Sequence, residues 1–184
     1  MLFRSENGGK ILAQRRDPYF NRDIFSFCSH QHTPPVLKDA GAGIIQGKDG
    51  IYIAWEIFAD YANKGALIAK QVVNHAIGLI LDKTFKSNMP SGGVVTLMKQ
   101  PQFNRYINHL LYASPVKRGS GIEVIEDLIP LYNISAELII SEKINKIYDA
   151  KTKQEIKFNQ DGSKLKFTVD KLECHKAIIL EYQT

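Results

Sequence analysis

Apolar residues recur with the best helical period of the chain over residues 69–80. The positions follow the i, i+3, i+4, i+7, i+8 spacing of one helix face. They are Ala69, Val72, Val73, Ala76, Ile77 and Ile80. Polar residues fill the other side, namely Lys70, Gln71, Asn74 and His75. The pattern predicts a helix over residues 69–80 that buries one face.

Before this helix the pattern predicts short strands. Residues 10–14 are typical of a strand, and residues 17–23 are polar, aromatic and irregular. Two apolar runs, 42–46 and 51–55, then flank Gly47-Lys-Asp-Gly50. A short connection that contains glycine between two such runs predicts a β-hairpin.

After the helix, the apolar pattern has mostly a period of two. Residues 82–93, with Pro90 and a glycine pair, are typical of a linker. The alternating runs that follow are rich in Ile, Val, Phe and Tyr: residues 94–99, 106–112, 136–140, 146–149, 155–159, 165–169 and 177–182. Short strands without intervening helices predict an antiparallel sandwich or barrel. We expect an α/β domain over 1–88 and an all-β domain over 89–184.

Length and composition limit the class of protein. The chain has 184 residues, of which 44% are hydrophobic and 23% charged. These values exclude a disordered or collagen-like chain. The length suits one ordinary domain or two small ones, and it leaves no room for a large catalytic barrel.

Charge and hydropathy give no indication of nucleic acid or membrane binding. The net charge of +5 is spread along the chain, with 11 basic and 8 acidic residues in 1–88, and 13 and 11 in 89–184. Basic residues between Lys143 and Lys157 alternate with isoleucines, as on the outer face of a strand. The N-terminal residues lack the apolar core of a signal peptide, and the longest apolar run, 76–81, is far shorter than a membrane span. We expect a soluble protein in an undetermined compartment.

Cys28, His30 and His32 form the sharpest local feature. In an extended segment the period of two places all three side chains on one face. Thiolate and imidazole are preferred zinc ligands, so these residues are metal candidates. The alternative, a buried cysteine beside two hydrogen-bonded histidines, is favoured because no further Cys/His pair supplies the missing ligands. We therefore expect no metal and no cofactor.

Cys28 is also a candidate nucleophile, because neighbouring histidines could lower the pKa of its thiol. No strand-turn-helix elbow surrounds it, and a structural cysteine is the better interpretation. The remaining histidines, His75, His109 and His175, are interpreted as surface or hydrogen-bonded residues. Two cysteines this far apart, Cys28 and Cys174, cannot form a framework of disulfides.

A carboxylate cluster, Glu123, Glu126 and Asp127, raises the question of glycoside hydrolysis. That reaction needs two carboxyl groups that face each other across the sugar. Neighbours in one strand or turn do not achieve this geometry, so solvated charges explain the cluster better. The segment Gly41-Ala-Gly43 lacks the third glycine and the basic residue of a phosphate-binding loop.

Another set of residues is typical of a sugar-contacting surface. Side chains with several donors and acceptors hydrogen-bond hydroxyl groups, and aromatic rings stack on pyranose faces. The set comprises Tyr19, Phe20, Asn21, Arg22, His30, Gln31, His32 and Trp55.

Four segments together resemble a known family. They are residues 17–23, 27–35, 105–113 and 121–130. In this order they resemble the C-terminal part of β-galactosidase-like glycoside hydrolases that carry a trimerisation domain, over about residues 12–182. The resemblance implies a catalytic (β/α) barrel, then a trimerisation domain with a class-I glutamine-amidotransferase-like (flavodoxin-like) α/β fold, then a small β-domain.

The same resemblance implies that only the last two parts are here, the α/β part incompletely. No residue matches a catalytic position of the family, whose acid/base and nucleophile lie in the barrel. By analogy with the family, five residues would face the barrel or the sugar: Tyr19, Asn21, Arg22, His30 and His32.

These observations lead to hypotheses from different classes. The favoured one is a non-catalytic fragment or truncated relative of a glycoside hydrolase that serves domain packing, oligomerisation and sugar contact. The alternative is a stand-alone carbohydrate-binding module, and the third is a small metal or thiol enzyme built on Cys28, His30 and His32. An incomplete α/β domain exposes apolar surface, so we expect a homo-oligomer, with a catalytic barrel and carbohydrate as further partners.

Overall fold

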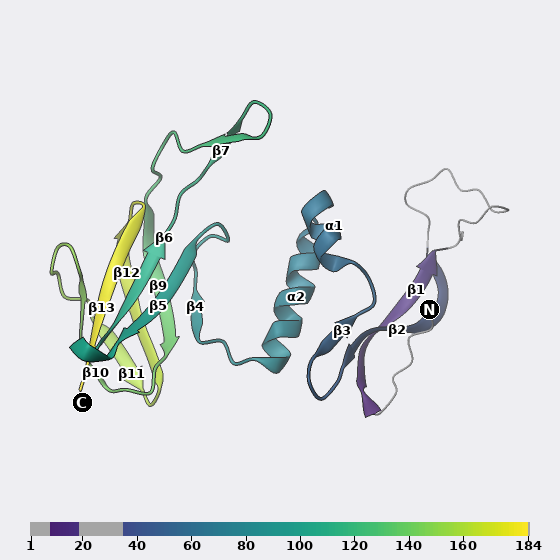
Figure 1. The fold of residues 1–184 in the computed structure, drawn as a ribbon, viewed down its shortest axis with the longest axis horizontal. Coiled ribbons are helices and arrows are strands. Elements are labelled where there is room, and N and C mark those ends of the chain that lie inside the picture. Colours follow the sequence, from purple (N-terminus) through teal and green to yellow (C-terminus); the bar gives the residue numbers. More distant parts are fainter. Residues whose placement is uncertain (1–7, 19–34, 184) are drawn as a thin grey trace. The chain divides into compact units, whose positions relative to one another are not determined.

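The computed structural model describes residues 8–18 and 35–183, and the chain divides into two compact units. Unit 1 is Met1–Asp82 and unit 2 is Lys83–Thr184. Figure 1 shows the elements of each unit. No helix in the described ranges is long and apolar enough to cross a membrane.

Unit 1 combines a small sheet with two helices. Its elements are β1 (Lys10–Pro18), β2 (Pro35–Gln46), β3 (Ile51–Ile53), α1 (Ile57–Lys64) and α2 (Leu67–Ile80). The sheet order is β1-β2-β3. The hairpin expected around residues 47–50 is confirmed, because Gln46 pairs with Ile51 and the Gly47 amide donates to the Gly50 carbonyl at 2.8 Å.

The predicted helix is confirmed as α2, which begins two residues earlier than its apolar pattern indicated. The shorter helix α1 was not predicted. It ends at Gly65, whose backbone is left-handed at φ 64° and whose amide donates to the Tyr61 carbonyl. Glycine occupies this conformation without the steric cost that other residues have.

The sheet of unit 1 differs from the fold implied by the resemblance. Both described strand pairs, β1 with β2 and β2 with β3, are antiparallel. A flavodoxin-like domain is built on parallel strands joined by crossover helices. The described residues of unit 1 therefore do not show a flavodoxin-like fold.

Unit 2 is a sandwich of two four-stranded antiparallel sheets. One sheet has the order β10-β13-β6-β5 and the other β11-β12-β9-β4. The first contains β5 (Val94–Gln100), β6 (Arg105–Leu111), β10 (Ile144–Asp149) and β13 (His175–Tyr182). The second contains β4 (Phe85–Ser87), β9 (Leu131–Ile139), β11 (Phe158–Asp161) and β12 (Lys164–Leu172). A short 3₁₀ helix, Pro101–Phe103, joins β5 to β6.

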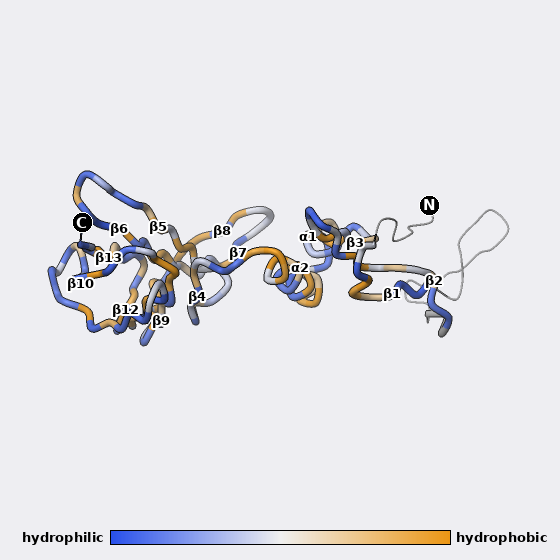
Figure 2. The backbone as a smooth tube through the Cα atoms, turned by 90° about the horizontal axis from the view of Figure 1, so that it is seen from below, coloured by the Kyte–Doolittle hydropathy of each residue, from blue (hydrophilic) through white to orange (hydrophobic). Residues whose placement is uncertain are grey.

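The core of unit 2 lies between these sheets and confirms the period-two prediction. Leu110 and Leu180 from one sheet and Leu138 and Leu165 from the other are completely buried. Along β12 buried and exposed residues alternate from Lys164 to Val169, and Figure 2 shows hydrophobic and hydrophilic residues mixed within the strands of the sandwich. Burying one face of each strand is what fixes its register.

Part of the predicted linker belongs to the sandwich. Residues 85–87 form β4, which pairs with β9 from Phe85↔Leu138 to Ser87↔Ala136. The structure accordingly divides after Asp82, earlier than the expected boundary at residue 88. A three-residue strand is too short to show periodicity and is defined only by its neighbour in the sheet.

A two-stranded hairpin leaves the sandwich between β6 and β9. It consists of β7 (Val116–Arg118) and β8 (Ile122–Val124), which pair with each other and with no other described strand. Arg118 closes it through two hydrogen bonds to Glu126, at 2.9 and 2.6 Å. We call residues 116–129 the β7–β8 arm (Figure 1).

Candidate functional site

The candidate residues between positions 19 and 32 lie outside the described residues. This applies to Tyr19, Asn21, Arg22, His30 and His32, and also to Cys28 of the metal and nucleophile hypotheses. Pro18 and Pro35, which bracket them, are register partners at one end of the β1–β2 pair. Their proposed contacts with sugar or barrel stay predictions.

The carboxylate cluster can be placed. Glu123 lies on β8 and is exposed, and Glu126 is held by the guanidinium of Arg118. Hydrogen bonding to this carboxylate raises the pKa of Arg118. Glu126 therefore closes the arm, which agrees with the interpretation of this cluster as solvated charge.

Helix α2 carries apolar residues that its own unit leaves exposed. Leu67 is 61% exposed and Ile68 65%, with Ile77, Leu79 and Ile80 above 40%. Leu81, which directly follows the helix, is 62% exposed. Its side chains also line three separate hollows, one with α1, one with the sheet residues Leu12 and Ile44, and one with Trp55. A helix with apolar residues around most of its circumference is normally buried inside a larger structure.

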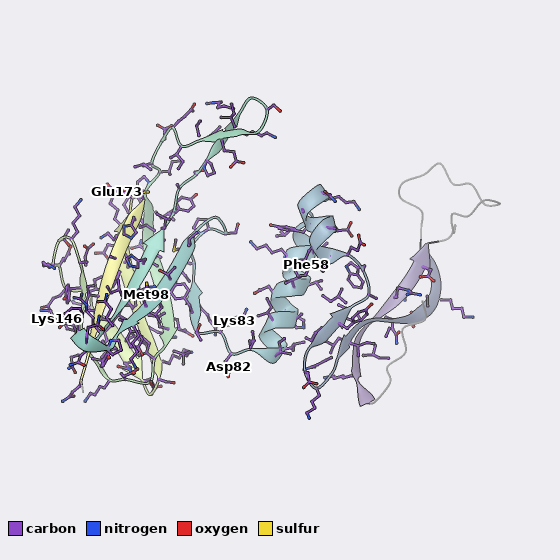
Figure 3. The ribbon with its side chains drawn as sticks, viewed as in Figure 1. Phe58, Asp82, Lys83, Met98, Lys146 and Glu173 are labelled. Atoms are coloured by element: carbon purple, nitrogen blue, oxygen red, sulfur yellow. The ribbon has the colours of Figure 1, made fainter. Side chains whose placement is uncertain are left out.

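Helix α1 extends this apolar region. Phe58 is 73% exposed, and Figure 3 labels it on α1. Phe58 and Tyr61 line a hollow of about 190 Å³ together with Val73 and Ile77 of α2. We call the exposed residues of both helices, with Leu81, the α1–α2 surface: Phe58, Tyr61, Leu67, Ile68, Ile77, Leu79, Ile80 and Leu81.

The sheet of unit 1 is apolar on its other side as well. Ile11 and Ile45 are register partners, and Tyr52 pairs with Ile45 from β3, so the three side chains share one face. Ile11 and Tyr52 are exposed. Leu12 and Ile44, each one position along its strand from Ile11 and Ile45, line the hollow that the sheet shares with α2. Apolar residues on both faces are typical of a sheet that other polypeptide covers on both sides.

The β7–β8 arm of unit 2 carries a second apolar region. Ile122, Ile125, Leu128 and Ile129 are each between 55% and 58% exposed. A lone two-stranded hairpin is marginally stable in water, and aliphatic residues gathered at this exposure are typical of interaction sites. The arm therefore has the composition of an interface.

Unit 2 also contains a groove of about 1090 Å³. It lies where the chain crosses from one sheet of the sandwich to the other. The Ile156 amide donates to the Ile147 carbonyl of β10 in the first sheet, and two residues later Phe158 pairs with Phe167 of β12 in the second sheet. Beyond Phe167, residues 168–172 of β12 pair with β9 alone among the described strands.

The groove is lined mostly by polar and charged side chains. Asp149 accepts hydrogen bonds from the amides of Lys151 and Thr152 and pairs with Lys176 at 2.9 Å. Burial alone would raise the pKa of Asp149, but Lys176 and these amides together lower it. Glu137 is surrounded by three lysines, Lys86, Lys164 and Lys166, at 3.6, 3.3 and 3.2 Å.

The groove lacks an aromatic platform for a sugar ring. Its two aromatic residues are Phe158, which packs against the core, and Phe167, which is 4% exposed. Stacking on an open ring supplies much of the contact between a protein and a pyranose face. The groove is therefore weak support for the carbohydrate-binding module.

Comparison with known proteins relates the chain to part of an enzyme. No protein-family model and no curated protein matches it. Among solved structures, the α-L-fucosidase isoenzyme 2 from Paenibacillus thiaminolyticus is similar, with 46% sequence identity and a TM-score of 0.88. The match covers 96% of this chain and 27% of the fucosidase chain.

This match agrees with the resemblance to glycoside hydrolases as a class of enzyme. It differs from the resemblance in the particular enzyme. The similar structure is a fucosidase, and a relation to β-galactosidases in particular is not shown. Because the chain spans only about a quarter of that fucosidase, it corresponds to one region of such an enzyme. The chain is therefore similar in sequence and fold to one region of a glycoside hydrolase, and in this chain that region combines a β-sandwich with a small α/β unit.

Proposed function

We propose that the chain is a non-catalytic accessory region of a glycoside hydrolase, whose apolar surfaces pack against the remainder of the enzyme. The α1–α2 surface is the observation that carries this proposal. Fully burying one large aliphatic or aromatic side chain contributes about 1.5–3 kcal/mol, so covering several such residues provides a strong driving force for association.

The surroundings of three carboxylates in unit 2 support a non-catalytic role. Glu142 is bound by Lys99 and Tyr106, Asp149 by Lys176, and Glu126 by Arg118. A glycosidase instead presents two carboxyl groups to the sugar. Carboxylates held in ion pairs are suited to fixing strands and turns.

The proposal extends to the fold of unit 1. Its antiparallel strands and two helices would be the part of a larger α/β domain that other polypeptide completes, by covering both α2 and the face that carries Ile11 and Tyr52. Three more specific parts of the proposal rest on the sequence resemblance. They are a β-galactosidase-like parent enzyme, a role in trimerisation and contact with sugar through residues 19–32.

A complementation experiment tests the proposal. The Paenibacillus fucosidase is produced without the stretch that matches this chain and is then mixed with the purified chain. We expect a stoichiometric complex by light scattering and increased hydrolysis of a nitrophenyl fucoside. No complex at micromolar concentrations, with both parts folded, would contradict packing against this enzyme class.

Substitutions on the helices locate the contact. Phe58→Asp and Ile68→Asp place a charge in the proposed interface and should weaken the complex at least tenfold. Asn63→Asp, at an exposed polar position of α1, is the matched control and should bind like wild type. Equal binding by all three variants would show that the α1–α2 surface is not the contact.

The same surface explains the expected self-association. Without other polypeptide to cover it, the chain should form oligomers whose size falls in Phe58→Asp and not in Asn63→Asp. Light scattering that shows a strict monomer at high concentration would contradict this part of the proposal. Hydrolysis of a nitrophenyl glycoside by the chain alone, abolished by changing one carboxylate, would contradict its non-catalytic role.

A further inference from the structure

Two histidines meet on the outer face of the sheet that contains β6 and β13. His109 of β6 pairs in register with Ala177, and His175 at the start of β13 pairs with Leu111. The two histidines are therefore diagonal neighbours on one face, a position from which aromatic side chains reach each other. The His109 Nδ1 and His175 Nε2 atoms are 3.0 Å apart.

The two rings meet edge to edge. Their centres are 5.2 Å apart and their planes differ by only 14°, whereas the facing nitrogens are much closer than the centres. In rings stacked face to face, the distance between the ring centres would be similar to the distance between the facing nitrogen atoms. The N–H of one imidazole therefore points at the lone pair of the other, along the line between the two facing nitrogens.

The contact between the two rings is exposed, although Leu111 lies opposite His175. The cross-strand neighbours of His109 on this face are Thr96 of β5 and Ala177 of β13, which are both small. Within the described part of the chain, neither His109 Nε2 nor His175 Nδ1 has a hydrogen-bond partner. These outer nitrogens are free to carry the ring protons.

We propose that His109 and His175 together bind one divalent late transition-metal ion, of the Zn²⁺ or Cu²⁺ type, between their facing nitrogens. Two zinc–nitrogen bonds of about 2.0–2.1 Å at a tetrahedral angle place the nitrogens about 3.3 Å apart. The observed 3.0 Å must open by a few tenths of an ångström, and both rings must turn so that their lone pairs meet at the ion, which lies beside the line between the nitrogens and not on it. The contact between the two side chains is exposed, so they can rotate in this way.

The protons balance without a further reactant. The imidazole that donates in the hydrogen bond gives up its inner proton to water and takes one up at its outer nitrogen. Both rings remain neutral, and both inner lone pairs then face the metal. The described residues offer no group of three or more His, Cys, Asp or Glu that could hold a metal, so water completes the coordination and the affinity is modest.

Calorimetric titration of the full chain with Zn²⁺, Cu²⁺ and Mg²⁺ tests this site. It is carried out on a Cys28→Ser, His30→Asn, His32→Asn background, which removes the other candidate ligands. We expect one equivalent of Zn²⁺ at micromolar to submillimolar affinity, tighter Cu²⁺ binding and no Mg²⁺ binding. His109→Gln and His175→Gln should each weaken Zn²⁺ binding at least tenfold, and His75→Gln on α2 should not.

Nitrogen chemical shifts of the histidine rings give a readout that needs no substitution. Zn²⁺ should shift His109 Nδ1 and His175 Nε2 together, at the same concentration. The proposal is overturned if Zn²⁺ shifts neither ring, or if it shifts only one. Zn²⁺ binding that persists unchanged in His109→Gln or His175→Gln would also overturn it.

Discussion

The cluster around Glu142 gives the sharpest prediction about the stability of unit 2. The Glu142 carboxylate accepts hydrogen bonds from Tyr106 Oη at 2.7 Å and Ser141 Oγ at 2.9 Å and forms an ion pair with Lys99. The Lys99 ammonium lies 5.5 and 5.4 Å from the ring centres of Tyr106 and Tyr182. The cluster links β5 and β6 to the segment between β9 and β10.

Replacing Glu142 with glutamine removes the charge and keeps the shape. The bonds from Lys99, then Tyr106, lower the pKa of Glu142 from 4.5 to about 2. At 1.36 kcal/mol per pKa unit this sets a ceiling of about 3 kcal/mol. The side chain is 20% exposed, and screening at the solvent edge reduces the expected loss to about 1–2 kcal/mol.

The pH dependence has a definite sign. A carboxyl group with a lowered pKa in the folded state contributes stability above its unfolded value, near 4.5, and loses it as the pH falls toward 2. We therefore expect Glu142→Gln to be less stable than wild type at pH 7 and to approach it between pH 4.5 and pH 2.

Urea unfolding followed by far-UV circular dichroism measures the effect. The midpoint of unit 2 should fall by about 1 M at pH 7. The single tryptophan, Trp55, lies in unit 1, so its emission reports on that unit and not on unit 2. Glu123→Gln on the exposed β8 is the control. A midpoint equal to wild type at pH 7, or a difference that does not change between pH 7 and pH 2.5, would refute the reasoning.

Three further predictions concern unit 2. Leu138→Ala should lower the free energy of unfolding in urea by about 2–5 kcal/mol, because Leu138 is completely buried. The same change at its exposed neighbour, Ile139→Ala, should lower it by less than about 1 kcal/mol. Equal losses would contradict the assigned faces of the strand. Gly162→Ala should lower stability by about 1 kcal/mol, since Gly162 has φ 56°, and Gly92→Ala, with open space and no positive φ, should not. Asp149→Ala should destabilise unit 2 by about 2–3 kcal/mol at pH 7, because the hydrogen bond from the Lys151 amide and the ion pair with Lys176 of β13 are lost. The difference in stability from wild type should shrink below pH 3.8, where the carboxyl group becomes protonated. A loss that does not change with pH would contradict the ion pair.

Several elements could be predicted because their pattern is local and long enough. The α2 spacing repeats over several turns, and the alternation along β12 continues through Lys164–Val169, so each identifies its own buried face. Helix α1, β4 and the β7–β8 arm were missed. Helix α1 has only eight residues, and β4 has three and exists through its pairing with β9.

The expected strand over residues 155–159 shows a second kind of error. The strand β11 begins only at Phe158, and Glu155 instead forms an isolated bridge with Tyr148 of β10. Apolar alternation cannot distinguish one strand from a segment that crosses between two sheets. That crossing, which opens the groove beside β12, depends on both sheets being assembled.

The sequence by itself determined the class of each part of the chain, because burial of one face imposes a period of two on strands and 3.6 on a helix. It also related the chain to glycoside hydrolases through several segments in a fixed order. Only the tertiary structure decided which apolar residues stay exposed on α1, α2 and the arm, and that His109 and His175, 66 positions apart, meet at 3.0 Å. Exposure and contact between distant residues depend on strand register and packing, which no local pattern contains.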